Sequence, residues 1–336
     1  MVLLRRAKRL VTRHVMSGVA SQDDTPLISA LVCTCSRDRL VANSVSSILA
    51  NAHANFELIV VDQSRDNETE EALARFRGDR RLKYLKSATI GKGNALNVGL
   101  KETRGAIIAI TDDDCTVPTN WLETFASIFV THPGVAVAFC CVKAGEHDRK
   151  AGFIPDYDRN GDRVIISKHG ARNLRGMGAG VAVRRSMIEK IGGFDPMLGP
   201  GSKFSSGDDR DIAIRALLAG YYVYETSLIA VNHFGFRTWE QGKSLARRDF
   251  LAIGAAYSKL LRCRNIELAY IPAWEFAKYA LWPPIWDLLH LRYPRGLVRI
   301  SAFVDGFIKG LRTPLDRTTM RFVDKEQDVL NSLKQV

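Results

Sequence analysis

The feature that most constrains the fold of this chain is a series of short β-rich runs separated by segments with helical periodicity. Two of these runs, at residues 58–61 and 106–110, are continuously apolar, as expected for strands buried on both faces. The alternation predicts an α/β fold, with helices flanking a mainly parallel central sheet. The predicted strands are Leu27–Cys33, Phe56–Val61, Leu82–Lys86 and Ala106–Thr111.

The chain is long enough for one large domain and an appendage. Its 336 residues exceed the roughly 100–200 residues of a typical domain, and a hydrophobic fraction of 46% is that of a globular protein. We expect a basic tail over residues 1–25, an α/β domain over residues 26–236, and a basic, tryptophan-rich helical appendage over residues 237–336.

The net charge of +12 is concentrated at the two ends of the chain. Residues 1–22 carry five basic residues and no acid, and residues 237–321 carry fifteen basic residues against seven acids. Basic ends on a nearly neutral middle indicate contact with a polyanion, either anionic lipid headgroups or nucleic acid. Charge alone does not choose between the two.

The six cysteines lie mostly in apolar runs and form no C-x-x-C pair, which predicts buried free thiols in a reducing compartment. The chain has no uninterrupted apolar run of about 20 residues, and its first residues lack the features of a secretory signal. Together these observations favour a cytoplasmic protein.

Polar residues follow three of the predicted strands, at the edge of a parallel sheet where ligands bind. They are Thr34 to Asp38, Asp62 to Ser64, and Asp112 to Asp114. Three consecutive aspartates repel one another, and a divalent cation relieves that repulsion. Hard oxygen ligands favour Mg²⁺ or Mn²⁺. Helix capping or solvation is the structural alternative.

Glycine-rich segments come next. In Gly91–Leu100 a helix is expected to begin near Asn94, and its N-terminus together with Lys92 suits a phosphate, although an ordinary loop-to-helix junction fits equally well. The segment lacks the spacing of a P-loop. The glycines at 176–180 and 192–193 are compatible with turns and also with close approach of a ligand.

A further helix is predicted after Gly207, with Asp208, Asp209 and Asp211 crowded into its first turn. Acids at this position complement the helix dipole. The functional alternative is a general base directed into a cleft.

Taken in order, these segments resemble the family 2 inverting glycosyltransferases with a GT-A fold, from about Pro26 to His233. The motifs that carry the resemblance are Asp62-Gln63-Ser64, Ile110 to Asp114 followed by Pro118, Gly192 to Asp195, and Gly207 to Ile212 with Arg215 and Gly220-Tyr221.

The resemblance implies a role for each of several residues. The nucleotide would be flanked by Thr34, Ser36 and Arg37 and would also be bound by Asp112 and Asp113. Asp62 would form a hydrogen bond to the nucleotide base, and Lys92 and Asn97 would lie near the ribose or diphosphate. Asp114 and His233 would hold the metal, and Asp209 would be the catalytic general base beside Asp208. The acceptor or donor sugar would be faced by Gly178, Ala179, Gly180 and Asp211. Asp208 replaces the family's usual Glu, and Ala179-Gly180 stand where the family often has Asn.

The activity that the resemblance implies is hexosyltransferase-like. A sugar would pass from a nucleotide diphosphate sugar, most simply a UDP-sugar, to the hydroxyl of a glycan or lipid-linked acceptor, with Mn²⁺ or Mg²⁺ as cofactor. Cell-surface polysaccharide or glycolipid synthesis would be the setting. Two alternatives stay open: a nucleotide-sugar-binding protein without catalysis, and a nucleic-acid-binding module that uses the basic ends.

The C-terminal tryptophans bear on partners. Trp274, Trp282 and Trp286 lie in a stretch that prolines and charges interrupt, so it reads as amphipathic and not as a membrane span. Peripheral contact with the anionic inner face of a membrane and packing on the α/β domain fit this stretch equally, and a nucleic-acid partner fits less well. The first 22 residues suit a basic tail or a short basic helix at the same surface.

Overall fold

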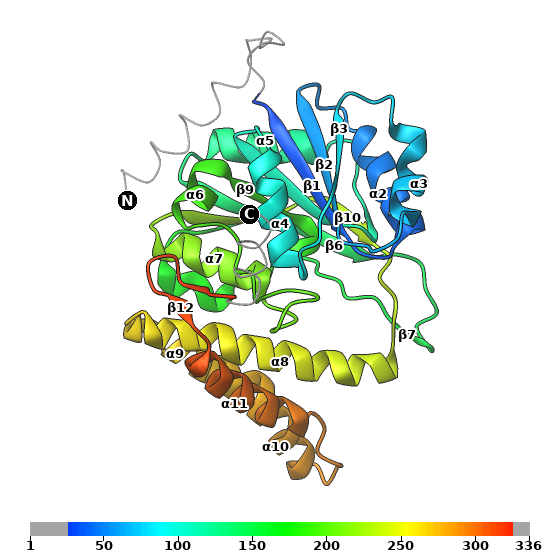
Figure 1. Ribbon diagram of the computed structural model, residues 1–336. Helices are drawn as coiled ribbons and strands as arrows, with labels where there is room; N and C mark the ends of the chain where they lie inside the picture. Colours follow the sequence, from blue (N-terminus) through cyan, green and yellow to red (C-terminus); the bar gives the residue numbers. More distant parts are fainter. Residues whose placement is uncertain (1–25, 325–336) are drawn as a thin grey trace, which may run out of the picture.

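The computed structural model describes residues 26–324, and the predicted N-terminal tail lies outside them. Its centre is a nine-stranded sheet of order β3-β2-β1-β4-β9-β6-β10-β5, with β8 pairing along β10 (Figure 1). The strands are β1 (Ile28–Thr34), β2 (Phe56–Asp62), β3 (Leu82–Lys86), β4 (Ile107–Asp112), β5 (Cys115–Thr116), β6 (Val135–Ala144), β8 (Arg163–Ile165), β9 (Val181–Arg184) and β10 (Tyr222–His233).

The sheet is mainly parallel, as predicted. Strands β1 to β4 pair in parallel, and β6 pairs in parallel with β10, while the short β9 runs antiparallel between β4 and β6. The register places Thr34 opposite Asp62 and Cys33 opposite Asp112. The polar residues that follow β1, β2 and β4 therefore meet at one edge of the sheet.

Helices cover both faces of the sheet because strand side chains alternate between them. Val32 packs with helices α2, α3 and α5, whereas its neighbour Leu31 packs with α4, α6 and α7. The first group comprises α2 (Asp38–Leu49), α3 (Glu68–Leu73) and α5 (Trp121–Thr131), and the second comprises α4 (Lys92–Glu102), α6 (Arg185–Lys190) and α7 (Asp208–Leu218).

Short elements complete the α/β domain and its junctions. The 3-10 turns are η2 (Ala74–Phe76), η3 (Lys168–Asn173), η4 (Gly178–Gly180) and η5 (Ile266–Leu268). Two small antiparallel pairs join β7 (Gly152–Phe153) to β11 (Arg237–Thr238), and β12 (Leu315–Asp316) to β13 (Arg321–Phe322).

The C-terminal region is helical, as predicted. Helix α8 crosses beneath the α/β domain, and α10 and α11 lie on its far side (Figure 1). A capping box between Thr238 and Gln241 begins α8. The elements are α8 (Trp239–Arg262), α9 (Tyr270–Glu275), a π-helical turn η6 (Phe276–Leu281), α10 (Trp282–Leu289) and α11 (Leu297–Arg312). None of the helices between residues 26 and 324 is long and apolar enough to cross a membrane.

Glycines let α8 and α11 approach closely. A Cβ on Gly254 would meet the backbone of Phe303, and one on Gly306 would meet the backbone of Leu251. Side chains at these two positions would push the helices apart. Within the appendage, α11 is therefore packed closely against α8.

Two local predictions need correction or refinement. The helix expected near Asn94 begins at Lys92, and the first and fourth strands are each displaced by one residue. The cysteine prediction is right for Cys115, Cys140 and Cys141, which are buried, and wrong for Cys35, which is exposed in the loop after β1.

Candidate active site

A cleft of about 740 Å³ lies at the carboxyl edge of β1, β2 and β4. Its walls come from the loops after these strands, the start of α4 and the end of β10. The lining residues are Cys33, Thr34, Cys35, Ser36, Arg37, Gln63, Arg65, Asp66, Thr89, Ile90, Gly91, Lys92, Asp112, Asp113, Asp114, Pro155, Met177, Pro200, Gly201, His233 and Arg237.

Lys92 lines this cleft at the start of α4. Gly91 precedes it with a φ of +88°, a backbone conformation that glycine adopts readily, and the turn presents the first residue of α4 to the cleft. The Lys92 ammonium forms an ion pair with Asp112. Burial alone would lower the pKa of Lys92, but Asp112 and Asp208 raise it above the usual range, so the cleft holds a permanent cation.

Asp113 is directed into the protein. Its carboxylate accepts hydrogen bonds from Thr34 Oγ1 at 2.8 Å and from Arg37 at 3.1 Å. Burial raises the pKa of Asp113 to about 6, against the opposing effect of Arg37. Asp113 therefore fixes the loop after β1, and Ser36 at the tip of that loop stays exposed to the cleft with a φ of +55°.

Asp62 is fully buried and does not line the cleft. One carboxylate oxygen accepts from the amide and hydroxyl of Ser64, and the other accepts from Tyr84 and Lys86. Burial would raise the pKa of Asp62, yet these donors lower it. All four acceptor positions of the carboxylate are taken. No oxygen is therefore free for the direct hydrogen bond to the nucleotide base that the resemblance implies. Asp62 instead shapes the turn that brings Gln63 to the cleft.

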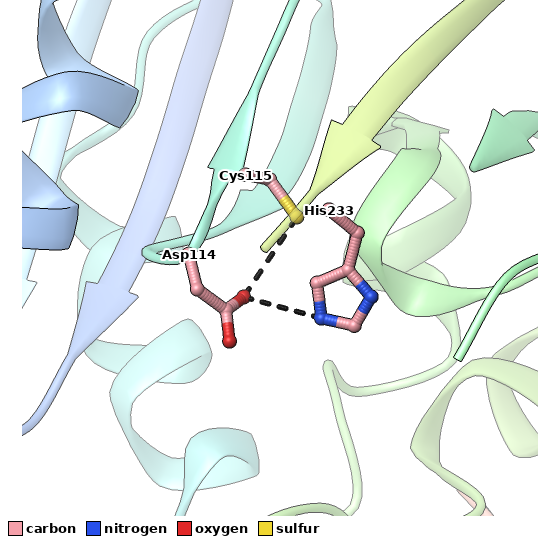
Figure 2. Close-up of side chains that lie close together, drawn as sticks. All are labelled: Asp114, Cys115 and His233. Atoms are coloured by element: carbon pink, nitrogen blue, oxygen red, sulfur yellow. Dashed lines mark hydrogen bonds and ion pairs between the residues drawn. The ribbon is translucent and has the colours of Figure 1, made fainter. Parts of the chain in front are cut away.

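Asp114 and His233 meet where the short strand β5 pairs with the end of β10 (Figure 2). The Asp114 Oδ1 to His233 Nε2 distance is 3.5 Å, and Cys115 Sγ lies 3.8 Å from the same oxygen. His233 Nδ1 lies 2.8 Å from the carbonyl oxygen of Pro155. Arg37 also contacts the other oxygen of Asp114.

The electrostatics of this pair favour charge on both partners. Burial would raise the pKa of Asp114, but His233 and Arg37 bring it down to about 2. Burial would lower the pKa of His233, but Asp114 raises it. The corner therefore holds an ionised carboxylate beside an imidazole whose ring is oriented from behind by a backbone carbonyl.

The donor set fits a divalent cation. Asp114, Cys115 and His233 each offer one ligand atom, and these atoms lie within 4.8 Å of one another. The carboxylate suits Mn²⁺ or Mg²⁺, which commonly take their other ligands from water and substrate phosphates, and His233 offers a nitrogen beside it. Cys115 is a weaker candidate because burial raises the pKa of its thiol. When bound, such a cation would neutralise charge that develops on a departing diphosphate.

Asp208 and Asp209 begin α7, and neither lines the cleft. Oδ2 of Asp209 accepts from the backbone N–H of Gly178 at 3.1 Å. A Cβ on Gly178 would lie 3.6 Å from Lys92 Nζ and 3.9 Å from that oxygen, so Lys92 and Asp209 flank Gly178. Burial raises the pKa of Asp209, and it raises that of Asp208 to about 6 while Lys92 opposes both shifts. The base candidate and the aspartate cluster are thus joined through Lys92.

Four further predicted residues, Asn97, Ala179, Gly180 and Asp211, make internal contacts and, like Asp62, Gly178, Asp208 and Asp209, do not line the cleft. The Asn97 amide is bonded to both the N–H and the C=O of Phe194, at 2.8 and 2.9 Å, so it anchors the Gly192–Asp195 turn and does not reach a ribose. Ala179 O accepts from Thr111 at 2.7 Å, and a Cβ on Gly180 would meet Cys140.

Asp211 is the fourth of these residues, and it lies in a buried ionic cluster. Lys259 of α8 contacts its Oδ1 at 2.5 Å, and Arg215 contacts its Oδ2 at 2.8 Å. Burial would raise the pKa of Asp211, but Lys259 and Arg215 lower it. These partners direct the carboxylate toward α8, away from the sugar side that the resemblance implies.

Several cleft residues were not anticipated from the sequence. Arg65 and Arg237 add positive charge to the walls, and Cys115 joins the Asp114 corner. A signal existed for each, since Arg65 directly follows the Asp62–Ser64 motif, Cys115 follows Asp114, and Arg237 lies four residues after His233. Met177 is brought in only by the tertiary fold.

Comparison with known proteins finds a family to which part of this chain is similar. Residues 29–192 match the family described as glycosyl transferase family 2. A glucosyl-dolichyl phosphate glucuronosyltransferase of Haloferax volcanii is 24% identical over 310 residues, which cover 85% of this chain and 97% of that protein.

Two other proteins extend the comparison. A UDP-Glc:alpha-D-GlcNAc-diphosphoundecaprenol beta-1,3-glucosyltransferase of Escherichia coli is 31% identical over 108 residues, 32% of this chain and 42% of that protein. The mannosyltransferase PcManGT of Pyrobaculum calidifontis, solved with GDP-Man and Mn²⁺, superimposes with a TM-score of 0.58 at 19% identity, covering 92% of this chain and 94% of its own. This likeness confirms the predicted GT-A-type fold. Residues 29–192 of the chain are therefore similar to glycosyl transferase family 2.

Proposed function

We propose that this protein is an inverting glycosyltransferase that moves a hexose from a nucleotide diphosphate sugar to an acceptor hydroxyl. One observation carries the proposal: Lys92, which lines the cation-rich cleft, and the partly buried Asp209 both lie beside Gly178. The cleft suits a diphosphate, and the aspartate suits a proton acceptor.

The donor would occupy the cleft between the loops after β1 and β2 and the start of α4. Arg37, Arg65, Lys92 and Arg237 supply positive charge for two phosphate groups. Thr34, Asp112 and Asp113 would hold the nucleotide side, with Thr34 and Asp113 acting through the loop that carries Ser36. We take a UDP-sugar as the first donor to test, since the Escherichia coli relative is named for UDP-Glc.

Asp114 and His233 would hold Mn²⁺ or Mg²⁺ together with oxygens of the donor. Arg37, which contacts Asp114, would then turn toward the phosphates. The chemistry that the cation supplies is neutralisation of the leaving group.

The chemical step uses Asp209 as general base. The acceptor hydroxyl gives its proton to the Asp209 carboxylate while its oxygen forms a bond to the anomeric carbon. The bond from that carbon to the diphosphate oxygen breaks, and the nucleoside diphosphate leaves with the electron pair. Attack from the face opposite the leaving group inverts the anomeric centre. Asp208 would keep the electrostatic environment of Asp209 and Lys92 in place.

The acceptor would be a glycan or a lipid-linked sugar at the inner face of a membrane, in cell-surface polysaccharide or glycolipid synthesis. Support comes from two relatives whose names state lipid-linked substrates, a dolichyl phosphate and a diphosphoundecaprenol. We propose peripheral contact with that membrane and no nucleic-acid partner.

A thermal-shift screen tests the proposal most directly. UDP- and GDP-sugars would be added to the full chain with and without Mn²⁺, and the stabilising donors would then be tested for release of nucleoside diphosphate with lipid-linked acceptors. We expect metal-dependent stabilisation by at least one donor, and turnover that Asp209→Asn abolishes without loss of donor binding. Stabilisation without any release of nucleoside diphosphate would instead indicate a binding protein that lacks catalysis.

A further inference from the structure

The hairpin that joins α10 to α11 exposes an unusual number of large apolar side chains. Leu291 is 98% exposed, Tyr293 86% and Leu289 68%. Single exposed leucines are ordinary, but a contiguous apolar patch marks an interaction surface. We call residues 282–299 the tip. Its other exposed apolar residues are Trp282, Ile285, Trp286, Leu288, Leu297 and Val298.

Asp287 and part of the turn backbone are hydrogen-bonded within the tip. Asp287, its one acid, is buried and accepts from the backbone N–H, Nε and Nη2 of Arg295 at 3.0, 3.0 and 2.7 Å. The amide of Leu291 donates to Leu288 O and that of Arg292 to Asp287 O, at 3.0 and 2.8 Å. Pairing of this acid and of these backbone groups lowers the cost of moving the turn into a less polar environment.

Positive charge surrounds the apolar patch. From residue 276 to residue 304 the chain has four basic residues, Lys278, Arg292, Arg295 and Arg299, and only one acid. A hollow of about 490 Å³ opens beside them, lined by Trp282, Pro283, Trp286, Asp287, Arg295, Gly296 and Arg299. Guanidinium groups bind phosphates, and indole rings favour the interface between headgroups and acyl chains.

The position of the tip agrees with contact to an external surface. Figure 1 shows α10 and the adjoining end of α11 on the far side of α8 from the central sheet. The tip therefore can meet a partner without covering the cleft. Its occupant has to be apolar and anionic together. A second copy offers an apolar surface, but two tips carry the same positive charge and repel.

We propose that the tip inserts Leu289, Leu291 and Tyr293 into the headgroup region of an anionic phospholipid bilayer, with a lipid phosphate in the hollow beside Arg295 and Arg299. This proposal adds to the proposed function the surface that brings the enzyme to its acceptor. Only the statement that the acceptor lies at the membrane rests on the proposed function. Binding to vesicles requires neither donor nor turnover.

Vesicle co-sedimentation of the full chain tests the proposal. Vesicles of phosphatidylcholine would be compared with vesicles that also contain phosphatidylglycerol, without any donor. We expect binding to the anionic vesicles, and a loss of roughly tenfold in affinity for each inserted side chain removed, given the usual value of burying a large apolar side chain. The variants are Leu291→Glu and Tyr293→Glu.

Matched controls separate insertion from general surface effects. Val130 and Leu228 are 65% and 67% exposed on the α/β domain, so Val130→Glu and Leu228→Glu add the same charge at equally exposed apolar sites. These controls should bind vesicles like the wild type. Arg292→Gln should weaken binding to anionic vesicles about fivefold and leave the weak binding to neutral vesicles unchanged.

Three results would overturn the proposal. The first is equal sedimentation of the tip variants and the Val130 and Leu228 controls. The second is binding to RNA and to no vesicles, and the third is conversion of a dimer into a monomer by Leu291→Glu without any lipid binding by the wild type. Failure of the proposed function looks different. In that case vesicle binding persists, yet no nucleotide sugar is bound or cleaved.

Discussion

Arg210, the residue next to the proposed base Asp209, forms an ion pair with the buried carboxylate of Glu275 at the end of α9. The hydroxyl of Tyr257 in α8 donates to the other oxygen of Glu275 at 2.7 Å. The first turn of α7 is thus fastened to the C-terminal appendage. The appendage therefore helps to position the turn that carries the proposed base, and it is more than an attached helical hairpin.

Glu275→Ala should destabilise the protein and lower its activity. The change leaves the Arg210 guanidinium without its carboxylate, which costs about 2–3 kcal/mol. We expect kcat to fall while the donor Kd stays near the wild-type value, since no donor contact is removed. Urea unfolding and steady-state kinetics measure the two effects. Tyr257→Phe, which removes one hydroxyl, should give a smaller change in both. A fall in donor affinity with unchanged kcat would contradict the proposed link.

Asp209→Asn should reduce kcat by about 10²–10⁴-fold, the usual contribution of a general base. Binding of the donor, measured by titration calorimetry in the presence of Mn²⁺, should be retained. Asp211→Asn is the matched comparison on the same helix turn, because its carboxylate faces Lys259 and Arg215. The main effect of Asp211→Asn should be a loss of protein stability. If Asp209→Asn turns over at the wild-type rate, the proton of the acceptor hydroxyl is not taken by Asp209.

The acidic limb of the pH profile should lie above the ordinary aspartate range. Burial raises the pKa of Asp209 and raises that of Asp208 to about 6, so protonation inactivates the base at higher pH than for an exposed aspartate. kcat/KM should therefore rise as pH increases through this region. Because Lys92 lowers both pKa values, Lys92→Met should move the limb to still higher pH. A limb near pH 4 in both proteins would be inconsistent with this base.

Gly235→Ala should weaken metal binding. A Cβ at this position would lie 2.5 Å from His233 Nε2 and 2.6 Å from Asp114 Oδ2, so the two proposed ligands would have to separate. The Mn²⁺ concentration for half-maximal activity should rise by at least tenfold. Gly78→Ala is the control, since a Cβ there meets nothing within 4 Å. Equal Mn²⁺ dependence of the two variants would contradict the proposal that Asp114 and His233 hold the metal.

Lys259→Met should destabilise the fold by about 3–5 kcal/mol, the usual cost of removing one partner of a buried ionic cluster. The Lys259 ammonium is 1% exposed and lies 2.7 Å from Asp195 and 2.5 Å from Asp211. Lys309→Met removes an exposed helical pair with Asp305 and should cost less than about 1 kcal/mol. Urea unfolding of the two variants provides the comparison, and similar midpoints would show that the cluster contributes little.

Much of the architecture could be predicted from local sequence. The β-rich runs predicted the first four strands to within one residue. For β2 and β4 the reason is that burial on both faces imposes an apolar pattern that needs no knowledge of distant segments. The polar residues after those strands likewise had to gather at one edge of a parallel sheet. The aspartates at 112–114 and the acidic first turn of α7 were recognised in this way.

The tertiary structure decided which polar side chains face the cleft and which are used up inside the protein. Asn97 and Asp62 have the chemistry of ligand-binding residues, yet Phe194, nearly a hundred positions away, takes the amide of one, and Ser64, Tyr84 and Lys86 take the carboxylate of the other. A residue type fixes what a side chain can bind. Its partners fix what it does bind, and those partners arrive from segments that only folding brings together. The sequence determined the sheet and the acids at its edge, whereas the fold joined Asp112 to Asp209 through Lys92 and left the tip uncovered.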